Sequence, residues 1–503
     1  MAKRKRDEAT KEPQLTQPSK PAKSSKNIDS SSSEQFERAA ITLQIVTGSY
    51  ERVLHGFTAS ISPACFAPDD KTPKDSSSAV QFVDTFLFEA HSSSIKCLAL
   101  SPLPKADSTE PPKVILASGG SDERVNLYTL SAAPPTVNEH YPTVPTLAGN
   151  KILENPKNRE LGALMHHSAP ITALEFPSRS KLLASAEDNT ISVSKTRDLT
   201  VVSSIKAPNP KIQGRPSGDT APPGGSPSGV NDFAVHPSMK LMLSVGKGEK
   251  CMRLWNLVTG RKAGVLNFNR DILQSVKEGR WSTGEGRKIV WNTRGEEFAV
   301  AFEWGAVLFG VDSTPICRVV PSPRSKLHEI RYVSLGSSEA DELFAVSTED
   351  GRVMLYSTKN LRQPDEGDDS SIPHAEPVAQ IGGKAHGFPG RVKDFAILSL
   401  KGQAGITADD FAVVTANSEG VVRVWQLLGS ELCKASTKQS SGAVDIRTGN
   451  FLSSYETGNR ITCLKAFVMM PAEDPTPEDL EDSEGSFEEE SEEESSSEGS
   501  DAE

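Results

Sequence analysis

The chain has 503 residues and a formal net charge of −12. Its hydrophobic content of 36% and aromatic content of 6% are low for a chain that folds throughout, so we expect a folded core with polar insertions and tails. No apolar run approaches membrane-spanning length, and the N-terminal MAKRKRDEAT lacks the apolar stretch of a secretory signal. Composition therefore argues against a membrane or secreted protein and predicts a soluble, intracellular one.

Charge is distributed unevenly along the chain. Residues 1–26 hold eight basic and three acidic residues, whereas residues 471–503 hold sixteen Asp or Glu and no Lys or Arg. The intervening residues are close to neutral and carry no obvious field for nucleic acid. We expect residues 1–38 and 471–503 to be disordered because polar and charged residues dominate them. The six cysteines form no C-x-x-C pair, which predicts free thiols in a reducing compartment.

A hairpin pattern recurs seven times along the chain. Each copy is an apolar run that ends in a small residue, followed by a polar turn and an alternating run, and the copies begin at Ile45, Ile115, Leu182, Leu241, Phe298, Leu343 and Phe411. A shorter strand pattern accompanies it, beginning at Ser94, Ile171, Val230, Lys288, Leu327, Val392 and Ile461. Because an isolated hairpin cannot bury its apolar face, this repetition predicts sheets that stack on one another.

The two ends of the repeat complement each other. The first hairpin has no short strand before it, and the last short strand, at Ile461, has no hairpin after it. Joining them closes a ring and removes exposed strand edges. With an outer strand in most units, the sequence predicts an all-β, seven-bladed β-propeller over residues 41–468. Residues 41–90 and 461–467 would share the closing blade.

Polar residues recur at the positions that pin the strands of WD40 blades. The pattern is a His before the inner strand, a Ser or Thr in the second strand, an Asp in the turn and a Trp in the third strand. Such a buried polar chain costs stability unless each member is hydrogen-bonded. The candidate pins are His91, Ser118, Asp122, Asp188, Trp255, Asp350, His386, Thr415 and Trp425. We interpret them as structural residues, since a lone His in a β-rich chain is more often a satisfied core group than a ligand.

Two repeats depart from this pattern. In the repeat that begins at Leu182, His166 or His167 is available but Ala184 replaces the hydroxyl-bearing residue. In the repeat that begins at Leu241, Gly248 and Glu249 occupy the turn where Asp is usual. We therefore expect that blade to depend on apolar packing around Trp255 more than on a polar chain.

The chain lacks the catalytic motifs for which we searched. There is no G-x-x-x-x-G-K-[ST] loop and no G-x-S-x-G elbow. His328-Glu329 is not followed by the second His of a zinc-binding helix, and His166-His167 have no plausible further ligands nearby. We therefore predict a protein that is not an enzyme, with no cofactor, no metal and no small-molecule substrate.

The two tails carry short charged motifs. Lys3, Arg4, Lys5 and Arg6 form a basic cluster of the nuclear-targeting type, for which the alternative is a solvated basic tail. Acidic residues lie three places after Ser486, Ser491, Ser495 and Ser500, as in sites of acidophilic kinases. The acidic tail would either solubilise the protein or attract basic partners such as ribosomal proteins or histones.

Several segments resemble one family specifically. VTGSYERVLHGF (46–57), LGALMHHSAPITALEF (161–176), and VNDFAVHPSMKLMLSVG (230–246) with MRLWNLVTGR (252–261) are similar to the maintenance-of-killer WD40 proteins. These are fungal large-subunit ribosome assembly factors, whose animal relatives are known as PAK-interacting proteins. The acidic C-terminal tail departs from the Lys-rich tails of the family, which casts doubt on any contact of the tail with RNA.

The resemblance implies a non-catalytic nucleolar scaffold for 60S subunit assembly and ribosomal RNA maturation. Its partners would be pre-60S ribosomal proteins and assembly factors, with ribosomal RNA contacted through them. A second hypothesis is an adaptor that negatively regulates a PAK-family kinase. A third, a cullin-ligase substrate receptor, ranks last because Trp255-Asn256 and Trp425-Gln426 lack the Trp-Asp-x-Arg motif of such receptors.

Overall fold

The computed structural model describes most of the region between residues 40 and 471. The gaps within this region are residues 67–79, 105–111, 135–143, 146–150, 210–228, 280–281, 336–341, 365–369, 404–405, 407–408 and 433–447. The predicted disordered tails lie outside the described residues. So do the basic cluster and the candidate phosphorylation sites, namely Lys3, Arg4, Lys5, Arg6, Ser486, Ser491, Ser495 and Ser500.

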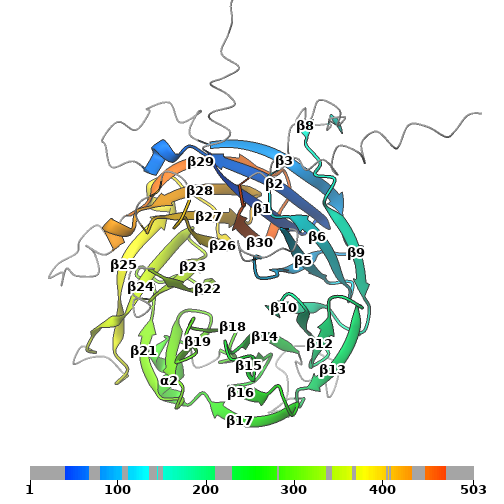
Figure 1. The fold of residues 1–503 in the computed structure, drawn as a ribbon. Helices are drawn as coiled ribbons and strands as arrows, with labels where there is room; N and C mark the ends of the chain where they lie inside the picture. Colours follow the sequence, from blue (N-terminus) through cyan, green and yellow to red (C-terminus); the bar gives the residue numbers. More distant parts are fainter. Residues whose placement is uncertain are drawn as a thin grey trace, which may run out of the picture.

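The described strands form a ring of seven blades (Figure 1). Four blades are separate four-stranded antiparallel sheets. Blade 1 contains β4 (Ile95–Leu100), β5 (Lys113–Gly120), β6 (Val125–Ser131) and β9 (Arg159–Leu164). Blade 2 contains β10 (Ile171–Ser178), β11 (Lys181–Ala186), β12 (Thr190–Lys195) and β13 (Thr200–Lys206). Blade 3 contains β14 (Val230–Val235), β15 (Leu241–Gly246), β16 (Cys251–Asn256) and β17 (Arg261–Asn267). Blade 6 contains β26 (Val392–Ser399), β27 (Phe411–Asn417), β28 (Val421–Leu427) and β29 (Asn450–Glu456).

Blades 4 and 5 are joined into one sheet through their outer strands. Blade 4 contains β18 (Lys288–Trp291), β19 (Glu297–Ala301), β20 (Ala306–Gly310) and β21 (Pro315–Val319). Blade 5 contains β22 (Leu327–Ser334), β23 (Glu342–Thr348), β24 (Arg352–Arg362) and β25 (His374–Gly382). A short parallel pairing of β21 with β25, at Arg318 and His374, connects them. The outer strand β21 was not predicted from the sequence.

The closing blade, blade 7, combines both ends of the folded region. Its inner strand is β30 (Ile461–Val468), followed by β1 (Ile41–Ser49), β2 (Val53–Ile61) and β3 (Val80–Glu89). The antiparallel register runs from Leu43 opposite Val468 to Ser49 opposite Ile461. The N-terminal strands, drawn in blue, therefore lie beside the C-terminal β30 (Figure 1). At the outer edge, β8 (Lys151–Ile152) pairs with β3 and with β7 (Val144–Pro145).

The described helices are short and lie in the connections. Among them are α2 (Arg270–Ser275) between blades 3 and 4, and the 3-10 turns η1 (Pro63–Phe66) and η3 (Lys384–His386). Asn269 caps α2, because its side-chain oxygen accepts a hydrogen bond from the Ile272 amide at 2.9 Å. The turn between second and third strands and the connection to the next blade lie at the same end of every blade. We call this side of the ring the hairpin face.

Close packing between blades explains why the hairpin copies have a small residue before the turn. A Cβ at Gly119 would lie 2.7 Å from Ile171 Cγ2 of the next blade. A Cβ at Gly48 would similarly lie 2.7 Å from Ile95 Cγ2 and 2.8 Å from Cys463 Sγ. The end of each of these second strands therefore approaches the next inner strand too closely for a larger side chain.

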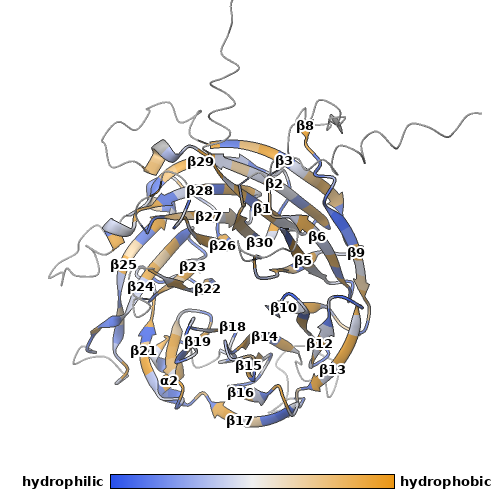
Figure 2. Ribbon diagram, viewed as in Figure 1, coloured by the Kyte–Doolittle hydropathy of each residue, from blue (hydrophilic) through white to orange (hydrophobic). Residues whose placement is uncertain are grey.

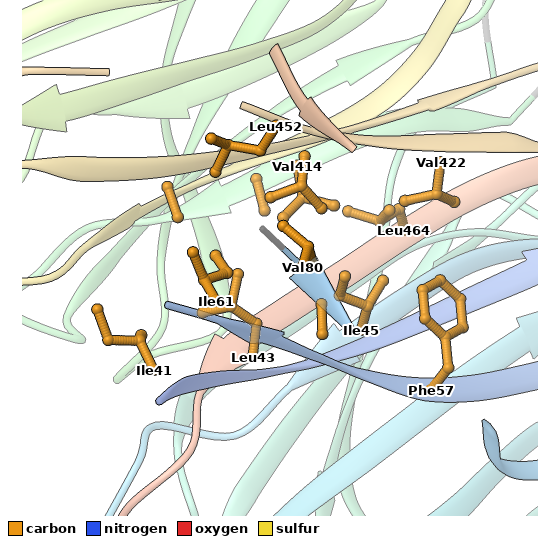
Figure 3. Close-up of a cluster of buried hydrophobic side chains, with 14 of the residues drawn as sticks. Ile41, Leu43, Ile45, Phe57, Ile61, Val80, Val414, Val422, Leu452 and Leu464 are labelled. Atoms are coloured by element: carbon orange, nitrogen blue, oxygen red, sulfur yellow. The ribbon is translucent and has the colours of Figure 1, made fainter. Parts of the chain in front are cut away.

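The buried apolar side chains of the described residues gather between neighbouring blades. Each of seven clusters draws its residues mainly from two adjacent blades. Apolar and polar residues alternate along many strands, as the colouring shows (Figure 2). Between blades 6 and 7, Leu43, Ile45 and Phe57 meet Val414 and Val422 (Figure 3). Burial between blades therefore supplies the apolar core that an isolated hairpin lacks.

Shortening a core side chain of β30 tests the importance of ring closure. Leu464 is fully buried between blades 6 and 7, so Leu464→Ala should lower the free energy of unfolding by about 2–5 kcal/mol. Chemical denaturation measures this change. Val265→Ala on the exposed outer strand β17 is the control and should change stability by less than about 0.5 kcal/mol. Equal stability of the two variants would contradict a closing role for β30.

Candidate functional site

In blade 1 the structure brings the predicted polar residues together. His91 Nδ1 lies 2.9 Å from Asp122 Oδ1, and His91 Nε2 lies 2.8 Å from Ser118 Oγ. The second Asp122 oxygen accepts a hydrogen bond from the Ser92 amide at 2.9 Å. Burial acts to raise the pKa of Asp122, but the neighbouring His91 and Ser92 hold it below its ordinary value. The network fixes the hairpin turn against the start of the inner strand.

Blade 2 completes a similar network with a different hydroxyl. His167 Nδ1 lies 3.2 Å from Asp188 Oδ2, and His167 Nε2 lies 2.9 Å from Ser192 Oγ. Ser192 belongs to the third strand, so it supplies the group that Ala184 in the second strand cannot. His166 also reaches Ser192 Oγ, at 2.6 Å. Burial lowers the pKa of His166 to about 4, so this imidazole is neutral at physiological pH.

In blades 3 and 6 the indole N–H of a tryptophan donates a hydrogen bond to a hydroxyl group of the second strand. Trp255 Nε1 donates to Ser244 Oγ at 2.8 Å, and Trp425 Nε1 donates to Thr415 Oγ1 at 3.1 Å. The side chains of Trp255 and Trp425 are both buried. In blade 3, Glu249 of the turn forms an ion pair with Arg253. Blade 3 therefore keeps part of the polar chain that its sequence had suggested was replaced by apolar packing.

The structure does not bring His386 to Thr415. His386 lies half-buried in η3, and the described residues show no hydrogen bond between the two side chains. Gly383 and Gly387, both with positive φ, bracket η3 and turn the chain before blade 6 begins. Phe388 instead packs edge-on against Trp425, with ring centroids 4.7 Å apart.

In blade 5, Asp350 is held by groups on its own hairpin. Its carboxylate accepts hydrogen bonds from Thr348 Oγ1 at 2.5 Å and from Arg352 Nε at 2.7 Å. The Arg352 guanidinium also donates to the carbonyl oxygens of Ser322 and Pro323, at 2.7 and 2.6 Å. An arginine thus takes over the connection to the preceding loop that a histidine makes in blade 1.

A further polar network, in the closing blade, was missed from the sequence. His55 Nε2 lies 2.8 Å from Asp84 Oδ1, and the Tyr455 hydroxyl of blade 6 donates to the same oxygen at 2.6 Å. His55 and Asp84 are both buried. A His and an Asp within otherwise apolar strand patterns were the available signal. The pair contributes to the junction where the ring closes.

Side chains of the inner strands connect consecutive blades around the axis of the ring. We call these contacts the inner-strand belt. Three of them bind the next backbone: Glu175 accepts from Val235 N (3.0 Å), Asp232 from Ile289 N (3.0 Å) and Asp394 from Leu464 N (2.9 Å). Two are ion pairs, Lys288 with Glu329 (3.0 Å) and Arg331 with Asp394 (2.9 Å). Thr462 Oγ1 donates to Ile95 O at 2.7 Å.

Burial gives the carboxylates of the belt distinct protonation behaviour. It raises the pKa of Glu175 to about 8, and that of Asp232 to about 6. Although burial also acts to raise the pKa of Asp394, the charges of Lys465 and Arg331 hold it below its ordinary value. The belt thus combines ionised groups with at least one carboxyl group that keeps its proton near neutral pH.

The described residues offer little to catalysis. They contain no group of three or more His, Cys, Asp or Glu side chains arranged to hold a metal ion. Burial raises the pKa of the Cys317 and Cys463 thiols to about 12, which disfavours the nucleophilic thiolate. No helix among the described residues is long and apolar enough to cross a membrane. The polar networks of the blades and the inner-strand belt stabilise the ring.

Comparison with known proteins agrees with this architecture. The model described as "WD domain, G-beta repeat" matches residues 158–193, which cover the end of blade 1 and most of blade 2. The chain is 22% identical to p21-activated protein kinase-interacting protein 1-like of Xenopus laevis, over 85% of this chain and 82% of the relative. It is 25% identical to Protein MAK11 of Saccharomyces cerevisiae, over 84% of this chain and 82% of the relative. The chain therefore carries a WD40 repeat and is similar to these proteins over most of its length.

WD40 propellers are generally scaffolds that bind other proteins. The human p21-activated protein kinase-interacting protein 1 is 22% identical over 88% of this chain and 83% of the relative. The networks of the blades are accordingly read as structural support for a binding surface.

Truncating Trp255 tests the support that blade 3 receives from its tryptophan. Trp255→Ala removes a buried indole and its bond to Ser244, and should lower the free energy of unfolding by about 3–5 kcal/mol. Trp255→Phe keeps most of the apolar contact and should cost less. Denaturation curves give both values. An unchanged transition for Trp255→Ala would show that the indole is not part of the core.

The protonated carboxyl group of Glu175 predicts a pH dependence of stability. The folded protein retains a proton that the unfolded chain loses near pH 4.5, so Glu175 makes stability fall as the pH rises from about 4.5 to about 8. Glu175→Gln keeps the oxygen that accepts from Val235 N and should flatten this fall. Denaturation at several pH values measures the slope. Glu456→Gln on the exposed outer strand β29 is the control, and an equal slope in Glu175→Gln and wild type would refute the prediction.

Proposed function

We propose that this WD40 protein is a non-catalytic scaffold for large (60S) ribosomal subunit assembly and ribosomal RNA maturation in the nucleus and nucleolus. The observation that carries the proposal is the similarity to Protein MAK11 over 84% of the chain. The resemblance of residues 46–57, 161–176 and 252–261 to maintenance-of-killer proteins supports the same role. The basic cluster from Lys3 to Arg6 supports nuclear targeting.

The architecture is suited to docking. The polar residues of the blades are engaged with one another, and the belt ties neighbouring inner strands together, so the ring presents a rigid frame. The connections between the third and outer strands of blades 1, 5 and 6 begin and end at the face opposite the hairpin face. Such a frame would hold pre-60S proteins and assembly factors in fixed relative positions, with ribosomal RNA contacted through them.

Depletion of the protein tests the ribosomal role directly. Loss of the scaffold should leave unprocessed precursor ribosomal RNA and lower the ratio of 60S to 40S subunits in sucrose gradients. Re-expression of the intact chain should restore both, whereas Leu464→Ala should restore them only in part because its ring is weakened. Unchanged precursor RNA and an unchanged subunit ratio after depletion would rule the role out. A fluorescent fusion tests location, with a nucleolar signal expected.

A second candidate function is negative regulation of a PAK-family kinase. It is favoured by the names of the Xenopus laevis and human relatives, which describe p21-activated kinase interaction. The purified full chain should then lower phosphorylation of a standard substrate by such a kinase, whereas heat-unfolded chain should not. Absence of both kinase binding and inhibition would eliminate this candidate. A purely cytoplasmic protein would favour it over the ribosomal role.

A further inference from the structure

The hairpin turn of blade 4 gathers positive charge at the hairpin face. This turn, Glu303-Trp304-Gly305, departs from the other repeats, and Trp304 is half-buried. The Arg324 guanidinium carbon lies 4.1 Å from the centroid of the Trp304 ring, and Lys326 Nζ lies 5.4 Å from it. The negative face of an indole attracts cations, so Trp304 helps to hold both side chains in place.

Bulges at the start of the inner strands place a ring of side chains nearby. In six inner strands the register shifts after the first residue, leaving the second residue outside the paired ladder. In β22 the third residue, Glu329, is also outside the ladder, and it forms an ion pair with Lys288 in the inner-strand belt. A bulge redirects the side chain that it carries. The second residues of these strands are Lys96, Thr172, Asn231, His328, Lys393 and Thr462, and Arg287 precedes β18 in the remaining blade. None of them is acidic, and four are Lys, Arg or His.

Contacts of two bulge residues reach the start of the next inner strand or the residues just before it. Thr462 Oγ1 donates to Ile95 O at 2.7 Å, and Asn231 Nδ2 donates to Gly286 O at 2.9 Å. The basic members of the set therefore lie at the axis of the ring, at its hairpin end. They are joined there by basic residues from the connections between blades.

His328 is surrounded by positive charge. Burial, and then the charges of four basic side chains, lower its pKa to about 4; these are Lys393, Arg391, Arg287 and Lys326. Its Nε2 is buried and has no hydrogen-bond partner among the described residues. Arg460 also lowers the pKa of Lys393 through its charge. We call the following residues the axial basic patch: Arg287, Lys326, His328, Arg391, Lys393 and Arg460.

Carboxylates neutralise only part of the patch. Glu303 lies 3.3 Å from Arg287 and 2.8 Å from Lys326, so one acid serves two cations. Glu349 lies 3.8 Å from Arg391, at the limit of an ion pair. The patch is therefore a net positive site at the end of blades 4, 5 and 6.

Among the described residues, no acidic side chain forms an ion pair with the remaining cations of the patch, Lys393 and Arg460. Within the part of the chain that the structure describes, Lys393 forms no ion pair. Burial, followed by the charge of Arg391, lowers its pKa, and the charge of Glu349 offsets only part of this shift. The Arg460 guanidinium lies over the Tyr50 ring at 5.6 Å, while its backbone amide donates to Glu51. An anion placed at the patch would stabilise these charges.

We propose that the axial basic patch binds carboxylate or phosphate groups carried by an acidic segment of a partner protein. The basic side chains of the patch are confined to the ends of blades 4 to 6, and the chain between residues 27 and 470 is close to neutral, so the face offers no continuous basic track for a polyphosphate backbone. A peptide can confine its acidic side chains to blades 4 to 6, which favours peptide over RNA. The inference does not depend on the ribosomal role.

A separate protein fits the patch better than the acidic tail of this chain. Arg460, at the hairpin face, leads directly into β30, and β30 runs from Ile461 away from that face to Val468. The chain therefore continues toward residue 471 at the opposite end of the ring. The acidic tail would have to return from the opposite face to reach the patch, whereas a segment of a separate protein would not.

Fluorescence anisotropy with the full-length protein tests the proposal. The probe is a fluorescein-labelled peptide of alternating Glu and Ser, used with and without phosphorylation, and compared with a Gln-Ser peptide of equal length. We expect saturable, salt-sensitive binding of the acidic peptides and none of the neutral one. Arg391→Glu with Lys393→Glu should weaken binding about tenfold or more. The matched control, Arg261→Glu with Lys262→Glu on the exposed outer strand β17, should leave binding unchanged.

Two further measurements keep the test decisive. Because Lys393 is half-buried, Arg391→Gln with Arg460→Gln, both at exposed positions, provides a milder second variant that should also weaken binding with an unchanged thermal transition. Absence of saturable binding, or equal loss in the β17 control, would overturn the proposal. So would single-stranded RNA binding as tightly through the same residues. Acidic-peptide binding that appears only after residues 472–503 are removed would assign the patch to the tail and refute a separate partner.

Discussion

The pairing of β1 with β30 is the constraint on which the whole ring depends. Every other blade draws its four strands from one continuous segment, whereas blade 7 needs both ends of the folded region. The seven core clusters each need two neighbouring blades, so an open ring would expose the apolar faces on both sides of blade 7. Tyr455 of blade 6 strengthens this junction by donating to Asp84, the carboxylate that also holds His55.

The inner-strand belt addresses a second problem of the ring, the connection of inner strands that share no backbone ladder. Glu175, Asp232 and Asp394 each use a carboxylate oxygen to satisfy an amide of the next blade. A buried carboxylate is costly unless it is paired or hydrogen-bonded, and the belt meets that cost with backbone donors and with Lys and Arg from adjacent strands. The cost remains visible where no cation is close enough: burial leaves the pKa of Glu175 near 8, so it folds in its neutral form.

Most of the fold could be predicted from the alternation of apolar and polar residues and from the repeated hairpin pattern, because both indicate which face of a strand is buried. The seven hairpins, their inner strands and six outer strands follow from the sequence for that reason. The outer strand β21 did not, since five residues beginning at Pro315 are too few for a clear alternation. Side-chain networks were harder still. Ser192 replaces the hydroxyl missing at Ala184 from a neighbouring strand, and two glycines displace His386, so position along the chain does not reveal either contact.

Departures from the repeat pattern coincide with the charge of the hairpin face. In blades 1 and 2 the carboxylates of the turn residues Asp122 and Asp188 each lie within hydrogen-bond distance of a histidine and help to hold the blade together. In blade 4 the same position is Trp304, which faces cations instead. A blade that is stabilised by apolar packing, or by a hydrogen bond within its own hairpin, does not need an Asp in its turn. Its turn can therefore contain other residues. The polar chain is complete in blades 1 and 2 and absent from the turn of blade 4. One side of the hairpin face can therefore carry the proposed binding site while the other side keeps the frame rigid.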